Sequence, residues 1–489
     1  MPGEAHIGQQ RKQARHRKRR IIFNNDGGDI DRAGAQTREA LLELRTSALA
    51  GSQVDAICYN AVKLFHGVRW AGRGFRIDPL ETMVEFCRGA GIEIFCSFRM
   101  NDIHNPSRFH RDHPECLFGT QENEPPYGAW FGVDYSQPLA RERAFGEVRE
   151  ICQRYDLDGI ELDFFRHPVL FRRHAWGQPL EQAQLDAMTG LLRRIRAMTD
   201  LTGTDRARPM LLAVRVPESL GYCRAIGLDL ERWLSEDLVD LLVAGGDFPL
   251  APWEHMVELG HEYDVPVHAC LNNSWTNGLG AIQSNGEGRH EAKDRNSIES
   301  YRGRAAVAWN AGVDGVYLFN FFDPHLSLWR EVGDRETLGG LDKDFYANVL
   351  GFWGVSRPRL SLKDGERFLR LATLSPDRPE VLETGQTLEI PFAVGENFQG
   401  GTAPGSRPQV RLQLLVENLS DVGDVHVALN GTPLSGGILR EGLQIEVPCQ
   451  LIRQGMNEVA MTLAAGMAAP VTIHDLMLSI RYDRVPSIR

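Results

Sequence analysis

The sequence predicts an α/β protein, a (β/α)8 TIM barrel followed by a C-terminal all-β sandwich. Short apolar runs alternate with amphipathic segments from residue 20 to about 350, and after about residue 356 helical periodicity gives way to β-rich runs. A chain of 489 residues is also too long for one ordinary core. We therefore expect a disordered basic tail over 1–19, a catalytic barrel over 20–355 and an accessory β-sandwich over 356–489.

Eight strand candidates, each followed by a helical pattern, favour parallel pairing in a closed barrel. No glycine-rich phosphate motif follows the first strand, which argues against a dinucleotide-binding open sheet. The strands are expected at Arg20–Asn25, Val54–Asn60, Ile92–Arg99, Gly159–Phe165, Met210–Val216, Val239–Gly245, Val265–Asn272 and Gly315–Phe322. The helices are expected at Thr37–Leu49, Pro79–Gly89, Leu139–Arg154, Leu180–Met198, Leu228–Ser235, Pro252–Tyr263 and Ile298–Ala311, with a last one near Asp342–Leu350.

The C-terminal third reads as antiparallel β structure. Turn residues separate its apolar runs, and Asn430-Gly431 is a hairpin signal between two of them. The runs are Thr387–Ala393, Gln409–Val416, Val425–Leu429, Leu443–Pro448, Asn457–Leu463 and Val471–Tyr482.

Charge and composition exclude several classes of partner. The net charge is −11 although the first twenty residues hold seven Lys/Arg against Glu4, so the remaining surface is too acidic for a nucleic-acid binder. No apolar stretch reaches membrane-spanning length, and no signal peptide is visible. The eight cysteines show no CxxC spacing. We expect a reduced, cytoplasmic protein without a membrane partner.

Polar residues gather at the C-terminal ends of the expected strands, where this fold builds active sites. A barrel selected for stability alone would carry Val, Ile and Leu there. With alternate residues pointing inward, the polar candidates for substrate contact are Asn24, Asn60, Arg99, Asp102, Glu161, Arg166, Arg215, His268, Asn272 and Asn320.

Three further residues are the catalytic candidates: Asp26, Asp163 and His167. Glu161 and Asp163 lie two apart on one strand face, so their charges push the two proton affinities apart, as acid and base roles require. Glu161, one layer deeper, can equally pair with an arginine of a neighbouring strand. Asp26 follows the first strand in a glycine-rich turn.

Arg99, Arg166 and Arg215 end three neighbouring strands. Converging guanidiniums indicate an anionic ligand group between them, and the alternative is neutralisation by Asp102, Glu161 and Asp163. Histidines after strands three and four also leave a zinc site open as an alternative, but no HxH or HExxH spacing occurs. We therefore expect no metal and no cofactor.

The barrel resembles the family-10-like glycosyl hydrolases of bacteria over most of residues 20–350. The phrases that carry the resemblance are Phe23-Asn-Asn-Asp-Gly, Phe98-Arg-Met-Asn-Asp102, Tyr155-Asp-Leu-Asp-Gly-Ile-Glu-Leu-Asp163, Arg166-His-Pro168 and Ala213-Val-Arg-Val-Pro217. Asp163 and His167 also keep the spacing of the strand-four motif of the alpha-amylase superfamily, although Glu161 stands where that motif has an arginine. Inverting TIM-barrel exo-sialidases are a further similar group. That likeness implies Asp26 and His167 as catalytic residues and the three arginines as the grip on the sugar carboxylate.

Together these features predict a glycosidase that acts from a chain end on an acidic sugar, a sialic or uronic acid. A glycan or small glycoside is the expected partner, and a homodimer stays open. The alternatives are a catalytically inactive carbohydrate-binding barrel and a metal-dependent hydrolase of another substrate.

Overall fold

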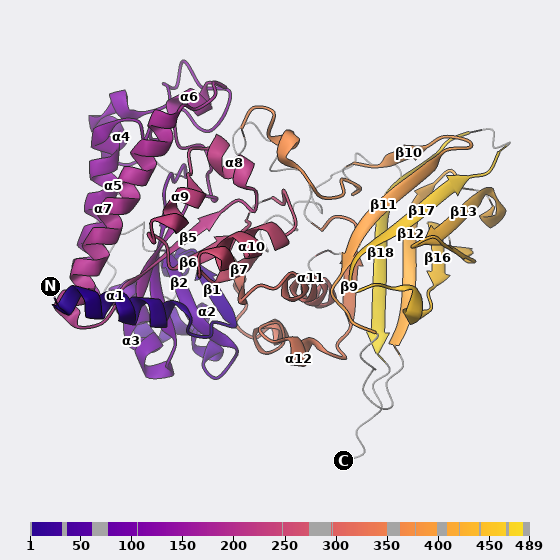
Figure 1. Ribbon diagram of the computed structural model, residues 1–489, viewed down its shortest axis with the longest axis horizontal. Coiled ribbons are helices and arrows are strands. Elements are labelled where there is room, and N and C mark those ends of the chain that lie inside the picture. The colour runs from indigo at the N-terminus through magenta and orange to yellow at the C-terminus, as the bar shows by residue number, and fades with distance from the viewer. Residues whose placement is uncertain are drawn as a thin grey trace, which may run out of the picture. The chain divides into compact units, whose positions relative to one another are not determined.

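The computed structural model of the chain is shown in Figure 1. It describes residues 2–31, 37–60, 77–104, 106–246, 248–272, 295, 297–349, 362–376, 378–398, 408–419, 421–439, 442–465 and 469–482. Two compact units make up the chain. The first comprises Met1–Asn272, Val313–Trp329 and Trp353–Arg370, and the second Asn273–Gly312, Arg330–Phe352 and Leu371–Arg489. The expected boundary between residues 355 and 356 lies outside the described residues.

Eight parallel strands close into a barrel in sequence order, which confirms the predicted fold. The ring closes where β1 pairs with β8, with Ile21 opposite Val316. The strands are β1 (Ile21–Asn25), β2 (Val54–Asn60), β3 (Glu93–Arg99), β4 (Gly159–Asp163), β5 (Leu211–Val216), β6 (Leu241–Ala244), β7 (Val267–Asn272) and β8 (Gly315–Phe319).

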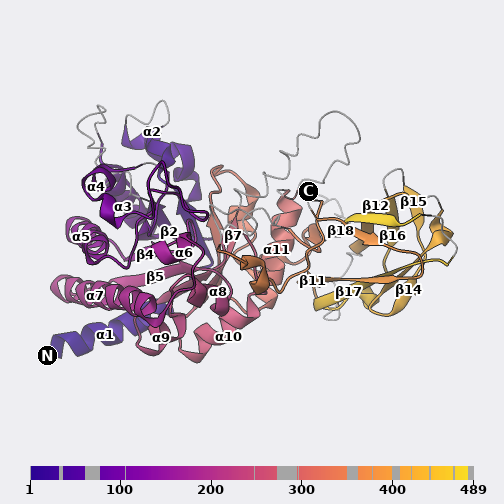
Figure 2. The same cartoon turned by 90° about the horizontal axis from the view of Figure 1, so that it is seen from above.

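The described helices follow the amphipathic segments, with local signals at their ends. The Asp78 side chain accepts hydrogen bonds from the first turn of α3, and Gly91 ends that helix in the left-handed region. The helices of the first unit are α1 (Pro2–Arg15), α2 (Arg38–Arg45), α3 (Pro79–Ala90), α4 (Arg108–Asp112), α5 (Pro138–Arg154), α6 (Arg172–Ala175), α7 (Gln182–Arg206), α8 (Leu220–Ala225), α9 (Leu230–Ser235) and α10 (Glu254–Glu262). Those of the second unit are α11 (Ile298–Asn310) and α12 (Arg335–Leu338). Helices α5 and α7 pack against one another (Figures 1 and 2).

Alternate residues of the strands fill the barrel, as the period of two in a β-strand requires. One buried cluster unites inward side chains of several strands. It contains Ala14, Ile22, Ala56, Cys58, Phe95, Leu211, Ala213, Leu241, Val243, Cys270, Tyr317 and Phe319. This apolar packing reaches Phe319 at the end of β8, opposite Asn24, so polar and apolar side chains share the strand C-termini.

The N-terminal segment corrects the prediction of a disordered tail over 1–19. Residues Pro2–Arg15 form α1, which packs against α7 (Figures 1 and 2). Arg11 and Arg15, one helical turn apart, both contact Asp237 and the fully buried Asp240, with Arg15 3.1 Å from the Asp240 carboxylate. The basic residues that indicated a solvated tail are therefore the partners of buried carboxylates, which orders the segment.

The second unit holds a six-stranded and a four-stranded antiparallel sheet, as expected for the sandwich. In β12 the buried residues alternate with more exposed ones, the pattern of a strand with one face in a core. The strands are β9 (Lys343–Tyr346), β10 (Glu380–Leu382), β11 (Thr387–Val394), β12 (Pro408–Glu417), β13 (Val425–Leu429), β14 (Thr432–Leu434), β15 (Gly437–Leu439), β16 (Gly442–Glu446), β17 (Gly455–Leu463) and β18 (Val471–Tyr482).

The helix expected near Asp342–Leu350 was wrong, because Lys343–Tyr346 is the strand β9. It runs antiparallel to β18, with Phe345 opposite Leu478, and all four of its residues are buried. Pairing with a distant strand thus overrode a local pattern that suited a helix.

All eight cysteines are free thiols, and all except Cys449 are buried. Among the described helices, none combines the length and the apolar character that crossing a membrane requires.

Candidate active site at the carboxyl ends of the barrel strands

The polar residues at and just beyond the strand ends form two layers. We call the deeper one the floor cluster: Ser97, Glu161, Asp163, Arg215 and Tyr317. The outer one is the rim cluster: Asp26, Asp102, His104 and His167.

Asp163 and Arg215 form a buried ion pair in the floor cluster. Arg215 donates two hydrogen bonds to the Asp163 carboxylate, at 3.0 and 2.8 Å, and the backbone N–H groups of Phe165 and Arg166 donate two more to Oδ1. Neither side chain is more than 1% exposed, and the Arg215 guanidinium lies 4.3 Å from the Phe319 ring centroid. The structure therefore favours Arg215 as the partner that neutralises Asp163 over Arg215 as a residue that binds substrate. The oxygens of Asp163 have little capacity left to accept a proton or a further hydrogen bond.

Glu161 lies one residue pair below Asp163, fully buried between strands. Burial, followed by the charge of Asp163, raises its pKa to about 7. The hydroxyls of Ser97 and Tyr317 act in the opposite direction, yet neither carboxylate oxygen has a partner in hydrogen-bonding geometry. Tyr317 in turn accepts a hydrogen bond of 2.7 Å from Asn24. Glu161 is therefore not the arginine partner that one interpretation of the sequence expected, because Asp163 holds Arg215.

Asp26 lies in the rim cluster directly after β1, and its side chain is 27% exposed. Arg45 of α2 contacts it at 2.7 Å, and the backbone N–H of Gly28 donates to it at 2.8 Å. Burial acts to raise its pKa, but Arg45, this backbone bond and Arg99 lower it below its usual value, so Asp26 is ionised. The turn needs a glycine at Gly27, whose φ is +69° and where a Cβ would lie 2.1 Å from the Asn60 carbonyl oxygen.

Asp102, His104 and His167 meet above β3 and β4. His104 Nδ1 is hydrogen-bonded to Asp102, and His167 Nδ1 lies 3.9 Å from the same Asp102 oxygen. Burial acts to raise the pKa of Asp102, but His104 and Arg99 hold it far below the usual range. Burial, followed by the charge of Arg166, keeps the pKa of His167 well below its ordinary value, so this imidazole is neutral. No HxH spacing relates these residues, so the sequence left a zinc site among the histidines after strands three and four only as an alternative.

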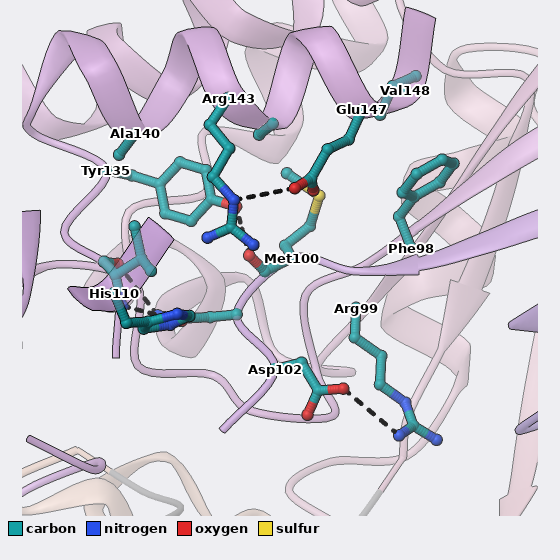
Figure 3. Close-up of a pocket in the computed structure, with 13 residues that line it drawn as sticks. Phe98, Arg99, Met100, Asp102, His110, Tyr135, Ala140, Arg143, Glu147 and Val148 are labelled. Carbon is teal, nitrogen blue, oxygen red and sulfur yellow. Dashed lines mark hydrogen bonds and ion pairs between the residues drawn. The ribbon is translucent and has the colours of Figure 1, made fainter. Parts of the chain in front are cut away.

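The Asp102 carboxylate lies on the side of β3 that faces away from α5. Figure 3 shows Asp102 and Arg99 facing one another there, with a closest distance of 3.9 Å. On the α5 side, Arg143 pairs with Glu147 at 2.9 Å, and the Tyr135 hydroxyl donates to the Met100 carbonyl (Figure 3). The Tyr135 bond fixes the backbone that leads into Asp102.

The remaining candidates divide between the two ends of the barrel. Asn60 and Asn272 are buried at the ends of β2 and β7, and Asn320 follows β8 with a left-handed φ of +62°. His268 was wrongly placed at the mouth. It is the second residue of β7, beside Gly315 and the Arg19 carbonyl, and burial with the Arg19 charge lowers its pKa to about 4.

Glu218 is a site residue that sequence reasoning missed. It follows β5, is 3% exposed, and accepts a hydrogen bond of 2.5 Å from the Leu250 backbone N–H. A Cβ on Gly245, whose φ is +101°, would lie 3.5 Å from Glu218 Oε2, and that oxygen is buried without a hydrogen-bond partner. Burial raises the pKa of Glu218 to about 7, against the backbone hydrogen bonds that lower it.

Two signals could have drawn attention to the missed residues. Val216-Pro217-Glu218 places a carboxyl directly beyond a strand end, the position that marked Asp26. Arg45 lies four residues after the buried Leu41, on the buried face of α2. An arginine at such a position needs a buried partner, and Asp26 supplies it.

Comparisons with known proteins show no family, and the solved structures to which the chain is similar include sugar-active enzymes. No family model matches, and no curated protein matches. An alpha-galactosidase of glycoside hydrolase family 36 from Geobacillus stearothermophilus is 12% identical, with a TM-score of 0.39 over 94% of this chain and 58% of that one. A cycloisomaltooligosaccharide glucanotransferase from Paenibacillus sp. is 9% identical, with a TM-score of 0.36 over 95% and 57%.

A family 18 N-acetylglucosaminidase from Paenibacillus barengoltzii is 14% identical, with a TM-score of 0.36 over 65% of this chain and 97% of that one. The chain thus spans less than two thirds of the length of the first two enzymes.

Proposed function

We propose that the chain hydrolyses a glycosidic bond at the C-terminal mouth of its barrel. The observation that carries the proposal is a pair of carboxyl groups at the mouth whose environments push their pKa values apart. Asp26 is held ionised beside Arg45, and burial raises the pKa of Glu218 to about 7. Glycoside hydrolysis uses two carboxyl groups in these two states, one as acid and one as base or nucleophile.

The two carboxyls have distinct roles in this proposal. Glu218 protonates the leaving oxygen through Oε2, which is buried beside Gly245 and has no hydrogen-bond partner. Asp26, partly exposed after β1, acts on the sugar or on a water as nucleophile or base. His167 is neutral and stays a candidate for assisting proton transfer. Asp163 takes a positioning role, because its oxygens are already engaged by Arg215 and the backbone.

Substitution of the two carboxyls tests the proposal on a panel of neutral, uronyl and sialyl aryl glycosides. We expect Asp26→Asn and Glu218→Gln each to lower kcat by about 10²–10⁴-fold, the usual contribution of a positioned acid or base. Asp55→Asn is a matched control: Asp55 is 24% exposed and pairs with Arg20 at 2.8 Å, but at the opposite end of the barrel. Full turnover by both variants, or no turnover of any glycoside by the wild type, would refute the proposal.

The pH profile tests the role of Glu218 separately. A general acid must be protonated, so activity should fall as the pH rises above about 7, where Glu218 loses its proton. Glu218→Gln should remove this alkaline limb from any residual activity. If the fall in activity above pH 7 persists unchanged in Glu218→Gln, another group is the general acid.

The finer proposal is that the sugar carries a carboxylate held by Arg99 and Arg166. The charges of Arg99 and Arg166 both lower the pKa of His167, and Asp102 is the carboxylate that raises it. Positive charge therefore predominates around this imidazole. We expect Arg99→Gln and Arg166→Gln each to raise KM for an acidic glycoside by about 10–100-fold, the loss of one charged hydrogen bond. A neutral analogue should show no such rise, and equal turnover of acidic and neutral glycosides by the wild type would exclude the acidic sugar.

A further inference from the structure

We propose that Asp102, His104 and His167 bind a divalent transition-metal ion, Zn²⁺ or an ion of similar ligand preference. One ligand atom of each side chain lies within 4.8 Å of the other two. The two imidazole rings meet edge to face, with centroids 5.0 Å apart. Two imidazoles and one carboxylate are the protein ligands of many three-ligand sites, which leave a position for water or substrate. This inference does not rest on the proposed glycoside hydrolysis.

The unsatisfied nitrogen of His167 is the second observation that points to an ion. His167 is 6% exposed, and its Nδ1 is buried with no partner in hydrogen-bonding geometry. A buried polar atom without a partner costs free energy, and a metal ion bonded to the lone pair removes that cost. The His104 side chain is 45% exposed, so an ion can reach the site from solvent.

The backbone that carries two of the ligands is fixed. Buried Asn101, next to Asp102, donates hydrogen bonds to the Val133 carbonyl at 3.1 Å and the Val169 carbonyl at 2.7 Å. Val133 returns a bond of 3.0 Å to the Asn101 side chain. Asn101 thus ties the loop after β3 to the loop that follows His167. Ligand bonds of about 2.1 Å place ligand atoms roughly 3.4 Å apart, so closure needs small rotations, which the exposed His104 ring can supply.

Nearby guanidiniums set the expected charge balance. Arg99 lies 3.9 Å from an Asp102 oxygen, and the Arg166 charge also acts on His167. These cations repel a divalent ion, and the ligand set supplies one negative charge. We therefore expect Arg99→Gln to tighten metal binding, opposite in sign to the effect of losing a ligand. The same charges favour an anion, such as hydroxide or a carboxylate, in the open coordination position.

Metal binding by the full-length, tag-free chain tests the inference without reference to activity. Chelator-treated protein is titrated with Zn²⁺ in a calorimeter, its bound metal is counted by mass spectrometry, and Co²⁺ reports coordination through its visible absorption. We expect one ion per chain. Loss of a residue that only supports a metal ligand costs up to about 100-fold in affinity, so loss of a ligand in His104→Ala, Asp102→Asn or His167→Ala should weaken binding by more than that. His113→Ala is the matched control, since His113 lies in the same loop but contacts Glu115 at 3.2 Å.

Two results would overturn the inference. One is no Zn²⁺ binding by the wild type, and the other is binding that survives both His104→Ala and Asp102→Asn. The His104→Ala variant is expected to fold, because His104 is exposed whereas His167 is buried. Far-UV circular dichroism is used to check that this variant is folded. Weakened binding in folded His104→Ala, with unchanged binding in His113→Ala, supports the site.

Discussion

The Asp163–Arg215 ion pair of the floor cluster and the Asp26 and His167 side chains of the rim cluster differ in how their polar groups are satisfied. In the floor cluster, Arg215 and two backbone N–H groups fill the oxygens of Asp163. In the rim cluster, Asp26 is partly exposed and the His167 nitrogen lacks a hydrogen bond. A carboxylate that is already satisfied holds neighbouring strands in register, whereas groups with spare capacity can bind or react. The position of a polar residue along a strand therefore indicates a site region without separating these two roles.

Breaking the floor pair should have the largest effect on stability. Asp163→Asn leaves the Arg215 guanidinium buried without its counter-charge, so we expect a loss of about 3–5 kcal/mol in the free energy of unfolding. Urea denaturation measures it. The double variant Asp163→Asn with Arg215→Met should recover most of the loss, because it removes the unpaired buried charge while the side-chain oxygen of the asparagine still accepts from the Phe165 and Arg166 N–H groups. If Asp163→Asn is as stable as the wild type but inactive, Asp163 is one of the reacting groups and its structural role in the floor cluster is refuted.

Glu161 should give the floor cluster a characteristic pH dependence. Its pKa is raised from 4.5 to about 7 by burial and by Asp163. A raised pKa in the folded state contributes stability that is complete below about pH 4.5 and lost as the pH rises to about 7. Glu161→Gln does not titrate, so we expect its stability relative to the wild type to increase by up to about 3 kcal/mol between pH 5 and pH 8. Unfolding free energies at both values measure this, and a constant difference would show that Glu161 keeps an ordinary pKa.

The rim carboxylate Asp26 should contribute least to stability. Its contact with Arg45 is partly exposed, so Asp26→Asn should cost about 1 kcal/mol at pH 7. Because its pKa is lowered in the folded state, this contribution is present above about pH 4 and lost in more acid solution. Denaturation at pH 7 and pH 3 checks the sign. A cost as large as that of Asp163→Asn would remove the distinction between the two clusters.

The sequence by itself determined the fold class and the end of the barrel at which the candidate site lies. Eight apolar runs with helical patterns between them predicted the closed barrel, and the period of two within strands placed Asp26, Arg99, Asp163 and Arg215 on the inward face. These features are local, because they follow from residue periodicity and turn residues within one element. The loss of helical periodicity after residue 356 predicted the two antiparallel sheets for the same reason.

The tertiary structure alone decided which charges find partners. Residues distant in sequence are involved in each case: Arg15 with Asp240, β9 with β18, and His104 with His167. No periodicity encodes such a pairing, so the sequence predicted a tail in place of α1 and a helix in place of β9. It left a zinc site among the histidines after strands three and four as an alternative, without pairing His104 with His167. Glu218 was missed for the same reason. Its raised pKa arises from burial beside Gly245 and Leu250, and burial is a property of the packed chain.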